Sequence, residues 1–411
     1  MKINKHCFPN GLRLVHHEDT STQMVALNIV YDVGARDEHP EHTGFAHLFE
    51  HLMFGGSVHI PDYDTPLQLA GGENNAWTNN DITNYYLTVP KPNVETAFWL
   101  ESDRMLELAF SEQSLEVQRG VVMEEFKQRC LNQPYGDVGH LLRALAFQVH
   151  PYRWPTIGKE LSHIEHATLD EVKAFFYRFY APNNAVLAVT GNISWDETVR
   201  LAEKWFAPIP RRDVPPRRLP QEPLQTQERR LAVERNVPLD ALFMSYHMCD
   251  RECADYYAFD ILSDILSNGR SSRLNRRLVQ EQNIFSSIDA YISGTRDAGL
   301  LQIGGKPAAG VSLEQAEAAV RKELEELQRS PVGGQELEKV KNKFESTQIF
   351  GNINYLNVAT NLAWFELTGK AEDIDCEVAR YRSVSTEQLH TVAQQTFRES
   401  NAVVLYYKSN R

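Results

Sequence analysis

The sequence lacks the segments that mark membrane-spanning and secreted proteins. None of its 411 residues belongs to an unbroken apolar run of about 18 residues, the length at which a transmembrane helix is expected. The stretch from Met1 to His6 is polar and basic and is not followed by the apolar segment of a secretory signal. These two absences predict a cytoplasmic protein without a membrane span.

Cysteine and positive charge are also scarce. The five cysteines are scattered, and their odd number favours reduced thiols over a disulfide framework. Cys249 and Cys253 have no second pair nearby, so idle thiols are favoured over a metal site. Lys and Arg number 42 against 55 Asp and Glu, which gives a net charge of −13. Because an acidic surface repels phosphates, we expect no nucleic acid and no anionic membrane among the partners.

The length and composition are those of a globular protein with more than one domain. Hydrophobic residues make up 42% and charged residues 24% of the chain. A chain of this length corresponds to roughly two or three domains. Prolines and arginines cluster between Pro208 and Pro223, which predicts an extended, stiff linker at the middle. We therefore predict domains at 1–212 and 227–411, joined by a linker at 213–226.

The two halves carry a faint internal repeat. A shift of 217 residues aligns 168–171 with 385–388, and both stretches have the pattern of a helix capping box. The same shift aligns 184–187 with 401–404 without a gap. A shift of 215 aligns Ala26, Tyr31 and Arg36 with Ala241, Tyr246 and Arg251. We interpret these matches as a duplication, with one domain in each half.

Strands and helices are interspersed in both halves. Apolar or alternating stretches predict strands at 24–33, 85–89 and 241–248. Helical patterns occur at 44–54, 114–131, 169–179, 194–206, 252–266, 312–329 and 334–350. This order favours the α+β class, with two homologous domains that each consist of a mostly antiparallel sheet packed with helices.

One predicted helix carries a candidate metal motif. His47 and His51 lie four residues apart, so they share one helix face and can hold one Zn²⁺ ion. Glu50 shares that face only in part, which allows its carboxylate to take a proton from water that the metal activates. This is the inverted form of the His-Glu-x-x-His arrangement, on a helix that Thr43 is expected to cap. Two surface histidines without a metal are the alternative.

A third ligand is expected from the helix at 114–131. On one of its faces lie Gln118, Val121, Val122, Glu125 and Arg129. Glu125 interrupts an otherwise apolar stripe, which is costly unless a partner such as zinc pairs with the carboxylate. A solvated helix charge is the alternative. The preceding glutamate is disfavoured as a ligand because it points about 100° away.

With Glu125 following His51 by 74 residues, the sequence resembles the pitrilysin–insulinase family of zinc metallopeptidases. Its length is similar to the mitochondrial-processing-peptidase branch and its bacterial relatives. The likeness includes 10–12, 71–86, 187–206 and 271–274 and so extends over nearly the whole chain. The resemblance implies His47, His51 and Glu125 as zinc ligands and Glu50 as general base. It implies an endopeptidase that hydrolyses peptides or unfolded segments in an enclosed chamber.

The resemblance implies further roles in the first half. Asn75 and Ala76 match a family segment that forms an exposed strand beside the metal and pairs with an extended peptide. The residues alone indicate a turn at 74–75 and a strand at 81–86. Gln118 lies two turns before Glu125 and is a candidate for orienting a ligand, with a core-edge amide as the alternative.

The second half is expected to lack a metal site. At a shift of 213 the positions of His47, Glu50 and His51 are taken by Asp260, Ser263 and Asp264. If the halves are duplicates, the second half forms a wall of the substrate chamber.

One departure from the family concerns the partner. Active relatives often carry an Arg, and a Tyr seven residues later, that hold the substrate carbonyl; here those positions are Val279 and Ser286. The resemblance therefore implies a zinc-bearing subunit that works as a heterodimer with a paralogous subunit carrying the pair, or as a homodimer. A catalytically silent structural or peptide-binding subunit is the alternative.

Overall fold

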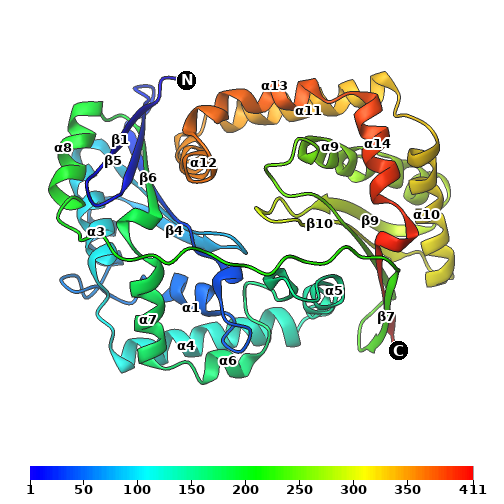
Figure 1. The fold of residues 1–411 in the computed structure, drawn as a ribbon, viewed down its shortest axis with the longest axis horizontal. Coiled ribbons are helices and arrows are strands. Elements are labelled where there is room, and N and C mark those ends of the chain that lie inside the picture. Colours follow the sequence, from blue (N-terminus) through cyan, green and yellow to red (C-terminus); the bar gives the residue numbers. More distant parts are fainter. Residues whose placement is uncertain (411) are drawn as a thin grey trace. The chain divides into compact units, whose positions relative to one another are not determined.

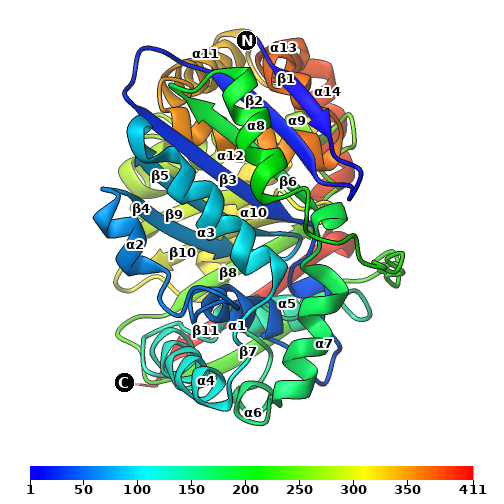
Figure 2. The ribbon, with the colours of Figure 1, turned by 90° about the vertical axis from the view of Figure 1, so that its left-hand side faces the viewer.

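The computed structural model describes residues 1–410, and the chain divides into two compact units (Figures 1 and 2). The first unit consists of Met1–Arg129, Trp154–Pro220 and Ile349–Cys376. The second consists of Cys130–Arg153, Gln221–Gln348 and the chain from Glu377 onward. Each unit contains segments from both halves of the sequence.

Each unit is built on one sheet, and the two sheets have the same topology. The first has the order β1-β2-β6-β3-β5-β4, formed by Asn4–Cys7, Arg13–Glu18, Ala185–Gly191, Met24–Tyr31, Thr83–Pro90 and Glu73–Thr78. The second has the order β7-β11-β8-β10-β9, formed by Arg229–Arg235, Ala402–Ser409, Ala241–His247, Leu300–Pro307 and Phe285–Ile292. In each sheet one pair is parallel, β2 with β6 and β7 with β11, and the other neighbours are antiparallel. The predicted α+β class with two homologous halves is confirmed.

The strand register reproduces the two sequence shifts. In the first sheet β3 pairs with β6 so that Ala26 lies opposite Thr190 and Tyr31 opposite Ala185. In the second sheet β8 pairs with β11 so that Ala241 lies opposite Tyr407 and Tyr246 opposite Ala402. Positions on β3 and β8 therefore differ by 215 and positions on β6 and β11 by 217, as the sequence alignment has them.

In the first unit, helices cover both faces of the sheet. The helices are α1 (Phe45–Leu52), α2 (Asp64–Leu69), α3 (Val94–Leu106), α4 (Glu112–Phe126), α6 (Leu161–Glu165), α7 (Leu169–Phe179), α8 (Trp195–Trp205) and α12 (Tyr355–Thr368). Side chains alternate along β3, as in any strand. Leu27 and Ile29 face the core shared with α1, α3, α4, α7 and α8, and Ala26 and Val30 face α12.

The second unit repeats this arrangement. Its helices are α5 (Val138–Ala146), α9 (Tyr256–Ser267), α10 (Leu313–Arg329), most of α11 (Gly334–Gly351), α13 (Glu377–Ser383) and α14 (Thr386–Thr396). The main core lies between the sheet and α9, α10, α11, α13 and α14, and α5 packs on the opposite face. Two segments, Lys127–Leu131 and Asn275–Glu281, are π-helical. The helices predicted from periodicity all form, within a few residues at their ends.

The remaining helical turns are short 3₁₀ segments, and none of the helices among residues 1–410 combines the length and hydropathy needed to cross a membrane. The 3₁₀ turns are Ala35–Asp37, Lys91–Asn93, Pro151–Arg153, Pro182–Asn184, Ala371–Cys376 and Glu399–Asn401. The proline-rich stretch at 210–226 contains neither helix nor strand.

The helices α5 and α12 are exchanged between the two halves. α5 begins at Val138 and α12 at Tyr355, 217 residues later, so they are counterparts in the repeat. α12, from the second half, contacts β3 and β6 of the first sheet. α5, from the first half, contacts β11, β7 and β8 of the second sheet. The compact units therefore differ from the continuous stretches 1–212 and 227–411, because the apolar face of each of these helices is buried on the sheet of the other half.

Candidate metal centre

The helix that carries the histidine motif does not begin as the sequence suggested. The prediction that Thr43 caps α1 is wrong: the N-cap is Gly44, at φ +87°, and no side chain of the N-cap residue contributes a bond. A positive φ is strained for residues other than glycine, so glycine suits this position. The Thr43 hydroxyl instead accepts the backbone N–H of Lys159 at 2.8 Å.

The first turn of α1 is held by Glu38. Its carboxylate accepts the backbone N–H groups of Gly44 at 3.0 Å and Ala46 at 2.9 Å, and the indole N–H of Trp154 at 3.1 Å. Glu38 is buried. A side-chain acceptor from outside the helix thus satisfies two N–H groups that an α-helix leaves unpaired at its start.

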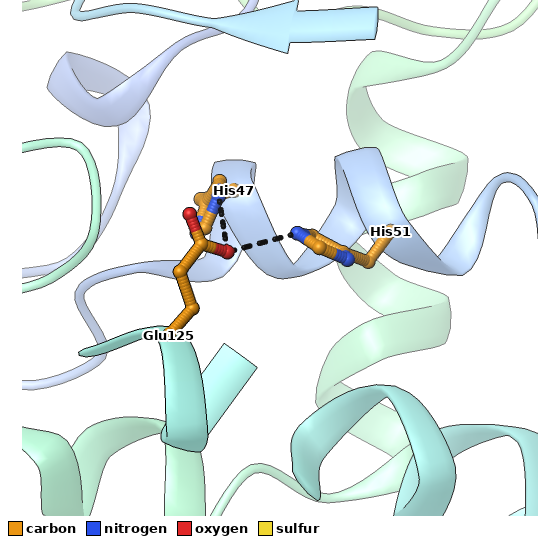
Figure 3. Close-up of side chains that lie close together, drawn as sticks. All are labelled: His47, His51 and Glu125. Carbon is orange, nitrogen blue, oxygen red and sulfur yellow. Dashed lines mark ion pairs between the residues drawn. The ribbon is translucent and has the colours of Figure 1, made fainter. Parts of the chain in front are cut away.

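His47, His51 and Glu125 converge on one point, as Figure 3 shows. Glu125 Oε2 lies 3.5 Å from His47 Nε2 and 3.4 Å from His51 Nε2. Among residues 1–410 these three form the one group of His, Cys, Asp or Glu side chains whose ligand atoms all lie within 4.8 Å of one another. The structure thus brings together the three residues that the sequence predicted as ligands, and it does not add Cys249 or Cys253 to a metal cluster.

The separations suit a metal better than direct hydrogen bonds. A charge-assisted N–H···O bond is about 2.7–2.9 Å long. Ligand atoms bound at about 2.0–2.1 Å around a tetrahedral zinc ion are roughly 3.3 Å apart. The two distances in this cluster, 3.5 and 3.4 Å, are close to the second value. Two imidazole nitrogens and one carboxylate oxygen are also a common donor set for catalytic zinc.

The charge states also suit metal binding. Burial lowers the pKa of His47 to about 4, so the imidazole is neutral near pH 7. Its Nδ1 is buried without a hydrogen-bond partner among the described residues, while Nε2 faces the cluster. The hydrogen bond from His51 lowers the pKa of Glu125, which keeps that carboxylate ionised. Neutral imidazole and ionised carboxylate are the forms that bind a divalent cation.

Glu50 lies on α1 between the two histidines and is half-buried. Burial raises its pKa, and the hydroxyl of Thr78 opposes this rise by hydrogen bonding to the carboxylate. A carboxylate whose pKa is raised towards neutrality is better suited to accept and return a proton. The arrangement can therefore support general-base chemistry beside the histidine cluster.

Asn75 and Ala76 lie on β4, at the open edge of the first sheet. β5 is the one strand that pairs with β4 among the described residues, so the turn that the residues alone indicated at 74–75 is wrong and this stretch is a strand. The N–H of Ala76 donates to Asn75 Oδ1 at 2.8 Å and so is not used in the ladder with β5. β4 also contacts α1. An open edge next to the histidine helix can receive an extended chain.

Helix α4 differs from its predicted pattern in two respects. Val121 is 46% exposed, and the buried positions are Leu115, Val122 and Phe126. Gln118 is half-buried, and no hydrogen bond joins it to the three clustered residues. The side chain that does bond to Glu125 is Arg129, whose NH1 lies 2.9 Å from Glu125 Oε1.

Sequence reasoning missed Glu38 and did not recognise the contact of Arg129. For Arg129 a signal was available, because its spacing of four residues from Glu125 is that of a helical ion pair. For Glu38 there was none, since its bonds to α1 depend on how the preceding loop folds back.

In the second unit, α9 occupies the place that α1 has in the repeat. Asp260 accepts a hydrogen bond from the hydroxyl of Tyr381. Asp264 accepts one from Asn268 Nδ2 at 2.7 Å. Among residues 1–410 no metal-ligand group includes these carboxylates. They are instead bonded to the surrounding chain.

Two family models match the chain. The model described as insulinase (peptidase family M16) matches residues 13–160, and the model described as the peptidase M16 inactive domain matches residues 166–344. The zinc protease PqqE of Helicobacter pylori is 26% identical over 407 residues, with 97% of this chain and 91% of that protein covered. An Arabidopsis thaliana protein named "Probable mitochondrial-processing peptidase subunit beta, mitochondrial" is 28% identical over 203 residues, which cover 49% of this chain and 38% of that protein.

A solved structure shares the whole fold. The crystal structure of a protease from Helicobacter pylori superimposes with a TM-score of 0.93 at 25% identity and covers 99% of both chains.

Proposed function

The chain belongs to the M16 (pitrilysin/insulinase) family of peptidases, and from this premise we propose that it is a zinc-dependent endopeptidase. The zinc ligands are His47, His51 and Glu125, and the general base is Glu50. The observation that carries the proposal is the convergence of two imidazole nitrogens and one carboxylate oxygen at 3.4–3.5 Å, with a half-buried carboxylate on the same helix.

The chain's own residues supply the proton transfers. A bound zinc ion supplies Lewis-acid activation of water and of the scissile carbonyl. The Glu50 carboxylate accepts one proton from the attacking water and then delivers it to the leaving nitrogen, so that the peptide and water become an acid and an amine. The hydroxyl of Thr78 bonds to Glu50 and limits the directions in which its carboxylate can point.

The substrate proposed for this site is an extended peptide. The open edge of β4 at Asn75 and Ala76 provides backbone groups for pairing with such a chain, next to α1. Pairing through the backbone does not depend on the substrate's side chains. This supports peptides or unfolded segments, admitted to an enclosed chamber, as the substrate class, and a cytoplasmic location is part of the same proposal.

The subunit arrangement follows from two positions in the second half. Val279 lies in the π-helical segment Asn275–Glu281, and Ser286 lies on β9, where its hydroxyl donates to the carbonyl of Lys306 at 3.0 Å. Neither side chain can hold a developing oxyanion as an Arg/Tyr pair would. We therefore propose a dimer, either with a paralogous subunit that carries the pair or with a second copy.

A second candidate is a catalytically silent structural or peptide-binding subunit. It is favoured by the model matched at 166–344, which is described as an inactive domain. The intact set of three candidate ligands and Glu50 in the first half favours the peptidase.

The test compares zinc content and peptide cleavage in three proteins. The wild type should hold one zinc per chain and cleave unstructured peptides, alone or with a paralogue. Glu50→Gln should keep the zinc and lose at least about 100-fold in kcat. Glu124→Gln, on the exposed side of α4, is the matched control and should change neither. Cleavage by Glu50→Gln at the wild-type rate would refute the mechanism. Full zinc without any cleavage by the wild type would favour the silent subunit.

A further inference from the structure

The two oxygens of Glu125 have different partners. Oε2 faces both histidines, at 3.5 Å from His47 Nε2 and 3.4 Å from His51 Nε2 (Figure 3). Oε1 lies 2.9 Å from the NH1 of Arg129. The carboxylate is therefore engaged on one side by the ligand cluster and on the other by a guanidinium group.

Arg129 reaches Glu125 from its own stretch of chain. It follows Glu125 by four residues, within the π-helical segment Lys127–Leu131 that continues α4. Its side chain is 67% exposed, whereas that of Glu125 is 20% exposed. An exposed pair at this spacing contributes only about 0.3–0.5 kcal/mol to stability, so the effect of this contact on the fold is small.

A neighbouring ion pair provides a comparison. Lys127 lies 2.5 Å from Glu124, with both side chains largely exposed, and neither residue contacts the histidines. The two pairs are adjacent in sequence and similar in spacing. They differ in that only the Arg129 pair includes a residue of the ligand cluster.

The chemistry of the contact restricts how Glu125 can bind a metal. A carboxylate can bind through one oxygen or through both, and a second bound oxygen would occupy a position that a catalytic zinc site keeps open for water and substrate. A guanidinium on Oε1 makes that oxygen a poor second ligand. Partners of this kind, bonded to a ligand but not to the metal, set the orientation of the ligand.

We propose that Arg129 is a positioning residue, which holds Glu125 Oε1 so that only Oε2 is presented to a metal held by His47 and His51. This inference rests on the proposed function, since it concerns the same site. It adds a residue that the ligand motif does not include.

The test measures zinc affinity by competition with a chromogenic chelator. Arg129→Ala should bind zinc about tenfold more weakly than the wild type, as expected for loss of a group that orients a ligand. Lys127→Ala is the matched control and should bind zinc as the wild type does. Arg129→Lys keeps the charge but not the planar donor group, and should recover part of the affinity.

A second readout separates positioning from a structural effect. Cobalt(II) in place of zinc should give a visible absorption spectrum that is altered in Arg129→Ala and unchanged in Lys127→Ala, because the spectrum depends on how many oxygens bind. The thermal unfolding midpoint of the zinc-free proteins should be the same in all variants.

The outcomes distinguish this inference from the proposed function. An affinity and a cobalt spectrum of Arg129→Ala equal to those of the wild type would overturn the role of Arg129 and leave the zinc site in place. Tighter binding by Arg129→Ala would also overturn it, because removal of a repelling charge would then outweigh orientation. Failure of the wild type to bind zinc would overturn both proposals.

Discussion

Asn184 and Asn401, 217 residues apart, make the same two hydrogen bonds in their respective units. Asn184 Nδ2 donates to the carbonyls of Phe179 at 2.8 Å and Asp32 at 3.2 Å. Asn401 Nδ2 donates to the carbonyls of Thr396 at 2.9 Å and His247 at 3.0 Å. Each asparagine ends a 3₁₀ turn directly before the strand that pairs in parallel with its neighbour. It thus ties the preceding helix to the end of the adjacent antiparallel strand.

This equivalence predicts that both asparagines stabilise the fold in the same way. Asn401→Ala should lower the free energy of unfolding by about 1–3 kcal/mol, because two carbonyls lose their donor in a buried region. Asn184→Ala should have a similar but smaller effect, since Asn184 is only half-buried. Urea denaturation measures both. Asn132→Ala, at an exposed position, is the control and should be close to neutral. Equal midpoints for Asn401→Ala and Asn132→Ala would contradict the prediction.

The exchange of α5 and α12 predicts that the halves of the chain depend on each other for folding. A fragment of residues 1–212 contains the first sheet but lacks α12, which covers the face lined by Val15, Ala26, Val30, Val186 and Ala188. That apolar face would be exposed, so the fragment alone should aggregate or bind a hydrophobic dye. Addition of residues 213–411 during refolding should restore a soluble protein with cooperative thermal unfolding.

A point variant tests the same contact in the full chain. Leu362 on α12 is fully buried against the first sheet, and Leu362→Ala should cost about 2–5 kcal/mol. Leu356 on the same helix is only partly buried, so Leu356→Ala is the control with a smaller effect. A fragment of residues 1–212 that is soluble and unfolds cooperatively by itself would refute the interdependence.

The sequence was sufficient for the parts of the molecule that depend on local spacing. The intervals of three and four residues among His47, Glu50 and His51 placed them on one helix, and the cost of an acidic group in an apolar stripe selected Glu125. The packing of α12 could not be predicted in this way, because an apolar helix face specifies that it must be buried but not by which of two similar sheets. Likewise, nothing local to Glu38 indicates that its carboxylate returns to the start of α1.

The contact between Glu38 and α1 predicts a link between the loop before the helix and the metal site. Glu38→Gln replaces one acceptor oxygen with an NH₂ group, which would face the N–H groups of Gly44 or Ala46. The free energy of unfolding should fall by about 1–3 kcal/mol, the range for a lost bond to a charged group. Zinc affinity should also fall, because His47 lies in the first turn of α1.

The control for Glu38 lies three residues further along the chain. Glu41 is exposed, and its side chain makes no hydrogen bond within residues 1–410, so Glu41→Gln should leave stability and zinc affinity unchanged. If Glu38→Gln behaved in the same way, the carboxylate would have no role in holding α1.

A pH dependence is expected from Glu317 on α10. Its carboxylate accepts hydrogen bonds from Arg230 at 2.6 and 2.9 Å and from Arg321 at 2.7 Å, and the Tyr406 hydroxyl donates to it at 2.5 Å. Burial alone would raise the pKa of Glu317, but these donors outweigh burial and lower the pKa from 4.5 to about 2. The folded state thus favours the ionised form more strongly than the unfolded state does.

The sign of the effect follows from that difference. Because the folded pKa lies below the unfolded one, the stabilisation is complete above about pH 4.5 and is lost as the pH falls towards about 2. Glu317→Gln should therefore be less stable than the wild type near pH 7, by about 1–3 kcal/mol after allowance for solvent screening. The gap between the two proteins should narrow as the pH is lowered. Glu325→Gln, which removes an exposed pair with Arg329 on the same helix, should show little gap at any pH. A gap for Glu317→Gln that stayed constant from neutral to acid pH would mean that the charge of Glu317 does not contribute to folding.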